Sequence, residues 1–455
     1  MKPNIFLIVI DSFRSDKCYG KNKTSITPTI DNIIKNGIYF NETFCSSSTT
    51  GSSIGSVFTA LFPFKTGMGG KTYRKLDSKN ILYTDILKEQ GYHPYALLPS
   101  SVIVTMGLPL GFEKNYETYP YHVHLFDGLG KQIIKKISSK VMQEPWFLYI
   151  HLNDLHSPIS PPKKFDRKEF GISKYEKMVS AIDYWLDKIF QKIDFEKTLF
   201  ILTADHGEYI PVIKIGDDII DFETGSSQKS LWKLGAKLPP SIFQHAAKLN
   251  RLLLTKRRKF KFSKLKMNLT PYQNRILLTS RMDLHNRVYD ELLHIPLIFA
   301  GFRVPAKGVI DGLVRNVDIF PTICDILGLK GPKIPLHGRS LLPLIKNQEL
   351  EELPLYIESP PSLEKSSEHV TGIRTSKYKY FSNTKNPKEN KVLFNLKNDP
   401  HEEHNIANEN PKLIEEMENL LKRLLRDSTT KEKQDQMSEE ETKKIEDELR
   451  KMGYI

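Results

Sequence analysis

The chain has 455 residues, 39% of them hydrophobic, and a formal net charge of +13. This length exceeds one small domain, and the apolar content excludes a disordered chain and is sufficient for a large catalytic core with a smaller unit attached. The three cysteines are widely spaced, which argues against a disulfide scaffold. The sequence has no apolar run of about 18 residues, so we expect no transmembrane helix. Because it also shows no signal-peptide pattern, we expect a cytoplasmic protein.

Short apolar runs alternate with helix-like segments along most of the chain. Buried strands are predicted at Asn4–Ile10, Trp146–Leu152, Thr198–Thr203 and Ile295–Ala300. Helices are predicted at Thr27–Lys35, Ser52–Leu61, Tyr175–Ile193 and Ile319–Leu327. This alternation predicts an α/β domain over residues 1–335, with a parallel sheet between two layers of helices.

The pattern changes after residue 335. Val370–Ser382 and Val392–Leu396 are expected to form antiparallel strands, and Pro411–Arg426 an amphipathic helix. Residues 336–426 are therefore interpreted as a small α+β subdomain. The highly charged tail, 427–455, is expected to be a solvated helix or disordered.

Polar side chains follow three of the predicted strands. Asp11 comes directly after the first strand, His156 follows the second, and Asp205 and His206 follow the third. Because the carboxyl ends of parallel strands meet at one edge of a sheet, we expect these side chains to converge on a site. His151 lies inside a strand, and we interpret it as structural.

Eight segments, in order, resemble the sulfatase family of the alkaline phosphatase superfamily. They cover nearly the whole chain except the tail and a basic segment at 224–282, and they include PNIFLIVIDSFRSDKCYG, SSIGSVFTALFPFKTGM, FLYIHLNDLHSPISPP, FILTADHGE and LFNLKNDPHEEHNIA. The resemblance implies an alkaline-phosphatase/sulfatase-like fold, with a mixed, mostly parallel sheet between helices and a small C-terminal α+β subdomain. It also implies a hydrolase or transferase of sulfate or phosphate esters.

The position of the nucleophile follows from this resemblance. The family's Cys or Ser lies thirteen residues before the proline of a TG-x-x-P motif; here that proline is Pro63, and 63 − 13 gives Thr50. A threonine hydroxyl can act as nucleophile when a divalent metal lowers its pKa. Cys45 is the alternative, as a formylglycine precursor, but it lacks the Pro and Arg of the family motif.

The resemblance implies four metal ligands and two further site residues. Asp11, Thr50, Asp205 and His206 would bind one or two divalent ions, and their chemistry does not choose among Zn²⁺, Mn²⁺, Mg²⁺ and Ca²⁺. His156 and His285 would bind the transferred group or protonate the leaving oxygen.

Several positions depart from the family pattern. Ser12 stands at the family's second aspartate, Ile54 replaces the motif arginine, and no lysine follows the Gly91-Tyr92 pair. These losses favour phosphate over sulfate esters, with glycan-linked and lipid-linked substrates both open. Two alternatives remain: a sulfuric ester hydrolase that uses formylglycine at Cys45, and a non-catalytic relative that binds an anionic glycan or lipid.

The basic segment between Thr224 and Met282 carries fourteen Lys/Arg and no Asp or Glu. It separates His206 from His285 by 79 residues, which is far more than in relatives, so we treat it as an insert near the mouth of the site. Contact with an anionic membrane surface, binding of an anionic polymer and a role as lid or oligomer contact all stay open. Nucleic acid is not expected, because no recognised binding module accompanies the charge.

Overall fold

A computed structural model describes most of the chain. The described residues are 2–106, 110–139, 141–223, 253, 256–265, 267–279, 287–361, 368–426 and a few positions between 438 and 447. His285, most of the basic insert and nearly all of the tail lie outside them. Among the described residues, no helix combines the length and the apolar character needed to cross a membrane.

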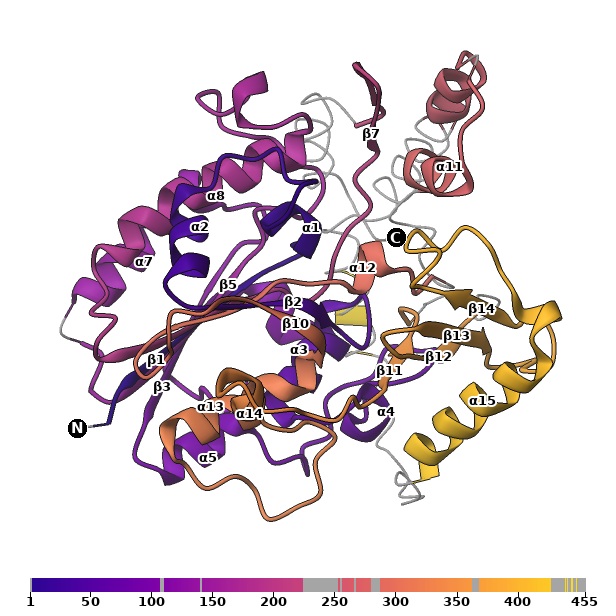
Figure 1. Cartoon of the computed structure of the whole chain (residues 1–455). Helices are drawn as coiled ribbons and strands as arrows, with labels where there is room; N and C mark the ends of the chain where they lie inside the picture. The colour runs from indigo at the N-terminus through magenta and orange to yellow at the C-terminus, as the bar shows by residue number, and fades with distance from the viewer. Residues whose placement is uncertain are drawn as a thin grey trace.

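An eight-stranded sheet forms the centre of the molecule (Figure 1). Its strands, in spatial order, are β10 (Gly308–Arg315), β2 (Ile38–Phe44), β9 (Leu297–Gly301), β6 (Thr198–Thr203), β1 (Asn4–Ile10), β5 (Trp146–Leu152), β3 (His93–Pro99) and β4 (Tyr116–Tyr119). All neighbouring pairs are parallel except those of β9, which runs antiparallel to both β2 and β6. The predicted mixed, mostly parallel sheet is confirmed.

Helices cover both faces of this sheet (Figure 1). One layer contains α2 (Pro28–Lys35), α7 (Leu129–Ser138) and α8 (Lys174–Phe190), and the other contains α3 (Thr50–Thr59), α5 (Tyr83–Glu89), α6 (Ser100–Met106), α13 (Ile319–Leu327) and α14 (Leu342–Ile345). The central strand β1 explains this arrangement, because its alternate side chains enter two separate cores, Phe6 on the α2 side and Leu7 on the α3 side. A strand buried on both faces has to be continuously apolar, as β1 is.

The C-terminal part forms a separate antiparallel sheet. Its strands are β11 (Leu355–Glu358), β12 (Val370–Arg374), β13 (Tyr378–Asn383) and β14 (Val392–Asn395), and α15 (Pro411–Arg426) packs against β12 and β13. Residues predicted as one strand, Val370–Ser382, instead form the β12–β13 hairpin, because the N–H of Thr375 donates to the carbonyl of Tyr378 and closes a turn. The boundary at residue 335 stays a prediction.

Short elements complete the described chain. They are α1 (Ser15–Cys18), α4 (Pro63–Thr66), α11 (Pro271–Leu278), α12 (Asp290–Leu293), the hairpin strands β7 (Val212–Ile215) and β8 (Asp218–Asp221), and the 3-10 turns at Leu125–Asp127, Lys168–Phe170, Asn316–Asp318 and Ala407–Glu409. The described part of the insert joins a third, small core in which Ile276 and Leu277 of α11 pack with Tyr209 and Ile213. The insert is thus attached to the segment that directly follows Asp205 and His206.

Candidate active site

The carboxyl ends of β1, β5 and β6 bring the predicted polar residues to one edge of the sheet. Val9 of β1 is in register with His151 of β5 and with Thr203 of β6, so the residues that follow these strands are neighbours. The N–H of Asp11 donates to the carbonyl of Leu152 at 2.7 Å, which extends the pairing into the site. The predicted convergence of Asp11 and Asp205 is therefore seen in the fold.

Ser12 links the two site carboxylates. Its hydroxyl donates to Oδ1 of Asp11 at 2.6 Å, and its N–H donates to Oδ1 of Asp205 at 3.0 Å. Ser12 has a φ of 63°, a conformation that L-residues rarely adopt, and this turn aims its N–H at Asp205. Where the family has a second aspartate, Ser12 therefore orients two carboxylates by hydrogen bonds.

His206 presents one ring nitrogen to these carboxylates. Its Nδ1 lies 2.8 Å from the carbonyl of Gly207 and so carries the proton, which leaves Nε2 with a lone pair. That Nε2 lies 3.5 Å from Oδ2 of Asp205 and 3.9 Å from Oδ1 of Asp11. A backbone carbonyl behind an imidazole is the usual way in which proteins orient a metal-binding histidine.

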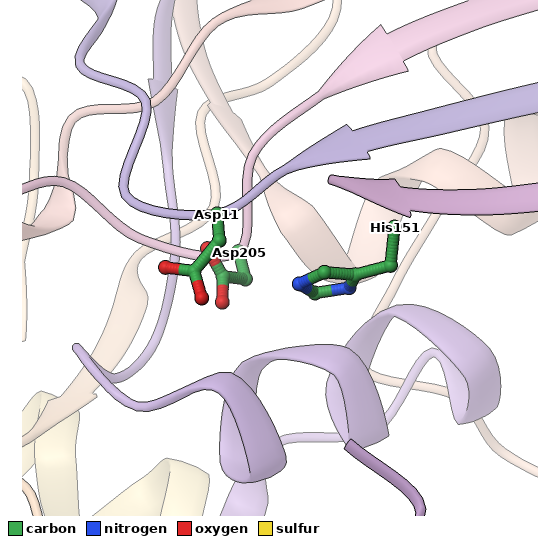
Figure 2. A group of neighbouring side chains, drawn as sticks. All are labelled: Asp11, His151 and Asp205. Atoms are coloured by element: carbon green, nitrogen blue, oxygen red, sulfur yellow. The ribbon is translucent and has the colours of Figure 1, made fainter. Parts of the chain in front are cut away.

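His151 also points into this group, contrary to the structural role predicted for it (Figure 2). One ligand atom each from Asp11, His151 and Asp205 lie within 4.8 Å of one another. Nδ1 of His151 is 2.7 Å from the hydroxyl of Tyr149, and burial lowers the pKa of His151 to about 4, so the ring is neutral at ordinary pH. The position of His151 within the strand did not reveal its role. The strand register places it in the site, because His151 pairs with Val9, two residues before Asp11.

These residues fit a divalent metal ion. Three of their buried polar atoms, Oδ2 of Asp205, Nε2 of His206 and Nε2 of His151, have no hydrogen-bond partner among the described residues. Buried polar atoms normally find a partner, and a carboxylate oxygen and two imidazole nitrogens without one have the composition of a metal site. Oxygen and imidazole ligands suit Zn²⁺ and Mn²⁺, and the donor set leaves the identity of the metal open.

A cavity of about 50 Å³ opens in front of these carboxylates. Its walls include the predicted residues Asp11, Thr50 and His156, together with Arg74, Ser101 and Tyr121. His156 is positioned by two contacts: its Nδ1 lies 2.9 Å from the carbonyl of Ser157, and the ring of Tyr121 packs edge-on against it. Thr50 and His156 are therefore brought to the same cavity as Asp11.

Thr50 is the first residue of helix α3, and this helix is hydrogen-bonded to the segment that carries Asp205. The hydroxyl of Ser53, one turn along the helix, donates to the carbonyl of Asp205 at 2.5 Å and accepts from the amide of Asn316. The first residues of α3, Thr50, Gly51 and Ser52, line the cavity, and its first turn has no acidic residue to offset the positive end of the helix dipole. This arrangement favours an anionic group close to Thr50.

The alternative nucleophile, Cys45, is not among the residues that line this cavity. Its thiol is completely buried and lies 3.3 Å from the carbonyl of Ser47, and burial raises its pKa well above the ordinary value. Ile54, at the position of the family arginine, is buried in the apolar core on the α3 side. His285 lies outside the described residues, so its predicted role stays a prediction.

The assembled group can perform ester hydrolysis or group transfer on a tetrahedral anion. It combines carboxylate and imidazole groups, a hydroxyl at a helix N-terminus and a third histidine, His156, all at or beside a small cavity. Sequence reasoning missed His151 and Arg74. Nothing in the local sequence of Arg74 marks it, because its loop reaches the cavity only through tertiary packing.

Comparisons with known proteins support this interpretation. The sulfatase family model matches residues 3–329, and the model for the C-terminal part of N-sulphoglucosamine sulphohydrolase matches residues 284–431. Arylsulfatase K of Rattus norvegicus is 22% identical in an alignment that covers 93% of this chain and 78% of the relative.

Solved structures of similar proteins agree in fold. The phosphonate monoester hydrolase of Agrobacterium radiobacter superposes with a TM-score of 0.64 at 15% identity, over 94% of this chain and 96% of that chain. A 2-O GAG sulfatase gives a TM-score of 0.64 at 17% identity, over 94% and 93%. At such low identities these structures establish the fold alone.

Proposed function

This chain belongs to the sulfatase family of the alkaline phosphatase superfamily and is an ester hydrolase of the sulfuric or phosphoric type, and from that premise we propose that it cleaves phosphate esters with Thr50 as the nucleophile. One observation carries the proposal. Thr50 lines the same cavity as Asp11 and His156, whereas Cys45 is buried away from that cavity.

The residues that would hold the metal are Asp11, Asp205, His206 and, as the geometry of the site adds, His151. A divalent ion bound there lowers the pKa of a nearby hydroxyl and neutralises charge on the ester oxygens. Ser12 keeps both carboxylates in place through its two hydrogen bonds. The carbonyl of Gly207 keeps the proton of His206 on Nδ1.

In the proposed step, Oγ1 of Thr50 loses its proton to solvent water and forms a bond to phosphorus while the bond from phosphorus to the leaving oxygen breaks. The first turn of α3 stabilises negative charge on the transferred group through its N–H groups. His156, held by the carbonyl of Ser157, is placed to protonate the leaving oxygen. Water then hydrolyses the phosphothreonine or, in a transferase, an acceptor alcohol takes its place.

The preference for phosphate rests on what surrounds Thr50. Ile54 places an apolar side chain in the core where relatives have the motif arginine, and Ser101 lines the cavity in the stretch where many of them carry a lysine. Conversion of Cys45 to formylglycine is the competing route, and it suits the sulfatases among the similar proteins. One protein of similar fold is a phosphonate monoester hydrolase, so this fold also occurs in enzymes that act on phosphorus esters.

Turnover of matched aryl phosphate, phosphodiester and sulfate esters, with each metal added in turn, tests the proposal. We expect metal-dependent phosphoester hydrolysis that falls at least about 100-fold in Thr50→Ala and partly returns in Thr50→Ser, because serine restores the hydroxyl. Thr118→Ala, on the exposed edge strand β4, is the matched control. Sulfate turnover that survives Thr50→Ala, with formylglycine at Cys45 in the mass spectrum, would establish the competing route instead.

We further propose that the described part of the basic insert docks on an anionic membrane surface. Residues 256–263 are helical, and one side of this segment packs through Phe262 into the small core with Tyr209. The other side exposes cations together with one large apolar ring. The exposed cations of this segment and its end are Lys256, Arg257, Lys259, Lys261 and Lys264.

The apolar side chain favours a membrane over a purely polar polyanion. Phe260 is 61% exposed among these cations, and the ammonium of Lys264 lies 4.3 Å from the centre of its ring. Exposed aromatic residues within a basic helical face are typical of helices that lie in a membrane interface. Each cation near such a surface contributes about 1 kcal/mol, so charge reversal should have a strong effect.

Co-sedimentation with vesicles tests this docking surface. We expect binding to vesicles containing phosphatidylserine but not to neutral ones, and a loss of at least about tenfold in Lys256→Glu/Lys259→Glu. Lys192→Glu/Lys197→Glu, which are also exposed cations, should bind like wild type. Binding to heparin without binding to anionic vesicles would overturn the membrane proposal and favour an anionic glycan.

A further inference from the structure

The cavity in front of Thr50 contains one permanently cationic side chain. Among the described residues that line it, Arg74 is the only lysine or arginine. The remaining walls are neutral or acidic and include Asp11, Tyr73 and Pro361. Arg74 and Thr50 line the same cavity, so a tetrahedral anion bound at Thr50 would lie in a cavity that also contains Arg74.

Among the described residues, neither position at which the family carries an arginine or a lysine supplies positive charge to this cavity. Ile54 is completely buried in apolar surroundings, and the wall nearest the start of α6 is formed by Ser101 and Val102. A dianionic phosphoryl group placed beside carboxylates nevertheless needs counter-charge at its outer oxygens. A guanidinium is well suited, because its planar donors can bind two oxygens of such a group at once.

The loop that carries Arg74 is fixed in place. It follows α4, and its chain packs so tightly that a Cβ at Gly69 would lie 2.6 Å from the backbone nitrogen of Phe64. The next N–H, that of Gly70, donates to Oε2 of Glu358 at 3.3 Å. The backbone leading to Arg74 is therefore held by both the catalytic core and the C-terminal sheet.

Glu358 lies beneath this loop at the end of β11. It is completely buried, and the hydroxyl of Tyr356 donates to it at 2.9 Å. Burial raises the pKa of Glu358 to about 8, and the nearby charge of Arg74 opposes that rise. Glu358 therefore contacts the loop that carries Arg74 through Gly70 and lies within electrostatic range of the Arg74 guanidinium.

We propose that Arg74 binds the outer oxygens of the phosphoryl or sulfuryl group in the substrate, replacing the cations absent from this site, and that Glu358 is its positioning residue. The inference rests on the proposed function for the location of the reacting group at Thr50. It adds a residue from a loop that the family motifs do not include. It also makes the C-terminal sheet part of the site, because β11 supplies Glu358.

Arg74→Gln, Arg74→Lys and the control Arg303→Gln test the assignment. Arg303 is exposed and follows β9, which runs antiparallel to β6, so it lies at the edge of the sheet opposite the site. We expect Arg74→Gln to lower kcat/KM for an aryl phosphate about 100-fold and to weaken competitive inhibition by inorganic phosphate at least tenfold. Arg74→Lys should recover part of both losses, and Arg303→Gln should match wild type.

A binding measurement separates this inference from the proposed function. Calorimetric titration of inorganic phosphate into the manganese-loaded protein reports anion binding even when no ester is turned over. Weaker phosphate binding in Arg74→Gln, with an unchanged melting temperature, supports the assignment whatever the reaction is. Equal affinity for phosphate in wild type and Arg74→Gln would overturn it, and so would equal kcat/KM.

Glu358→Gln should weaken phosphate binding less than Arg74→Gln does, because Glu358 acts through Arg74. An equal or larger loss would show that Glu358 itself contacts the anion.

Discussion

At the scale of single residues, Ser12 stands where the family has a second aspartate and holds the two remaining site carboxylates in place by hydrogen bonds. From the sequence, Ser12 in place of the family's aspartate implied either the loss of a charged ligand or a weak contribution from Ser12 itself. In the fold, the same residue adopts a left-handed conformation and donates to both Asp11 and Asp205. Those two hydrogen bonds fix the orientation of carboxylates that would otherwise repel each other at close range.

The buried carboxyl of Glu358 predicts an unusual dependence of stability on pH. Its pKa rises from the ordinary 4.5 to about 8 in the folded protein, chiefly through burial. Between these two values the folded state holds a proton that the unfolded state has lost, so stability falls as pH rises through this window. Glu358→Gln removes that penalty, because glutamine does not ionise.

We therefore expect Glu358→Gln to melt at a higher temperature than wild type at pH 9 and at nearly the same temperature at pH 5. A shift of one pKa unit corresponds to about 1.4 kcal/mol, which sets an upper limit of a few kcal/mol on the gain. Glu349→Gln, an exposed glutamate, serves as the control. Parallel melting curves for wild type and Glu358→Gln across pH 5–9 would contradict the prediction.

At the scale of elements, the contact between α12 and the C-terminal sheet depends on buried charges. Asp290 at the start of α12 pairs with Arg374 of β12 at 2.9 Å and with Lys379 of β13. Lys379 is completely buried and also pairs with Glu402 at 2.6 Å. Burial alone would raise the pKa of Asp290, but Arg374 and Lys379 hold it well below its usual range.

Lys379→Met should destabilise the protein by about 3–5 kcal/mol, because it leaves Asp290 and Glu402 buried with too little positive charge. Lys377→Met, two residues earlier and exposed, should change stability by less than about 0.5 kcal/mol. Urea denaturation of both variants measures the difference. Similar denaturation midpoints for Lys379→Met and Lys377→Met would show that the buried charges contribute little to the contact between α12 and the C-terminal sheet.

At the scale of the whole molecule, the parts predicted well are those in which local pattern and tertiary environment agree. The bounds of β1, β5 and β6 match the predicted strands, since each is a continuous apolar run buried on both faces. The convergence of Asp11 and Asp205 followed from the parallel order of these strands.

The remainder depends on contacts between distant segments, which local pattern does not encode. His151 depends on the register between β1 and β5, and Arg74 on the packing of its loop against the C-terminal sheet. The β12–β13 hairpin was missed because its turn at Thr375 contains no glycine or proline signal. The cytoplasmic location and the role of His285 stay predictions.

The site is assembled from segments spread along the chain, and this affects when activity can arise during synthesis. Asp205 is synthesised well after Asp11, and Glu358, which accepts from the loop that carries Arg74, is synthesised later still. A nascent or truncated polypeptide therefore lacks a complete ligand set. The proposed metal site can therefore form only after synthesis has passed Asp205 and His206, so a polypeptide interrupted before that point cannot bind a metal ion there.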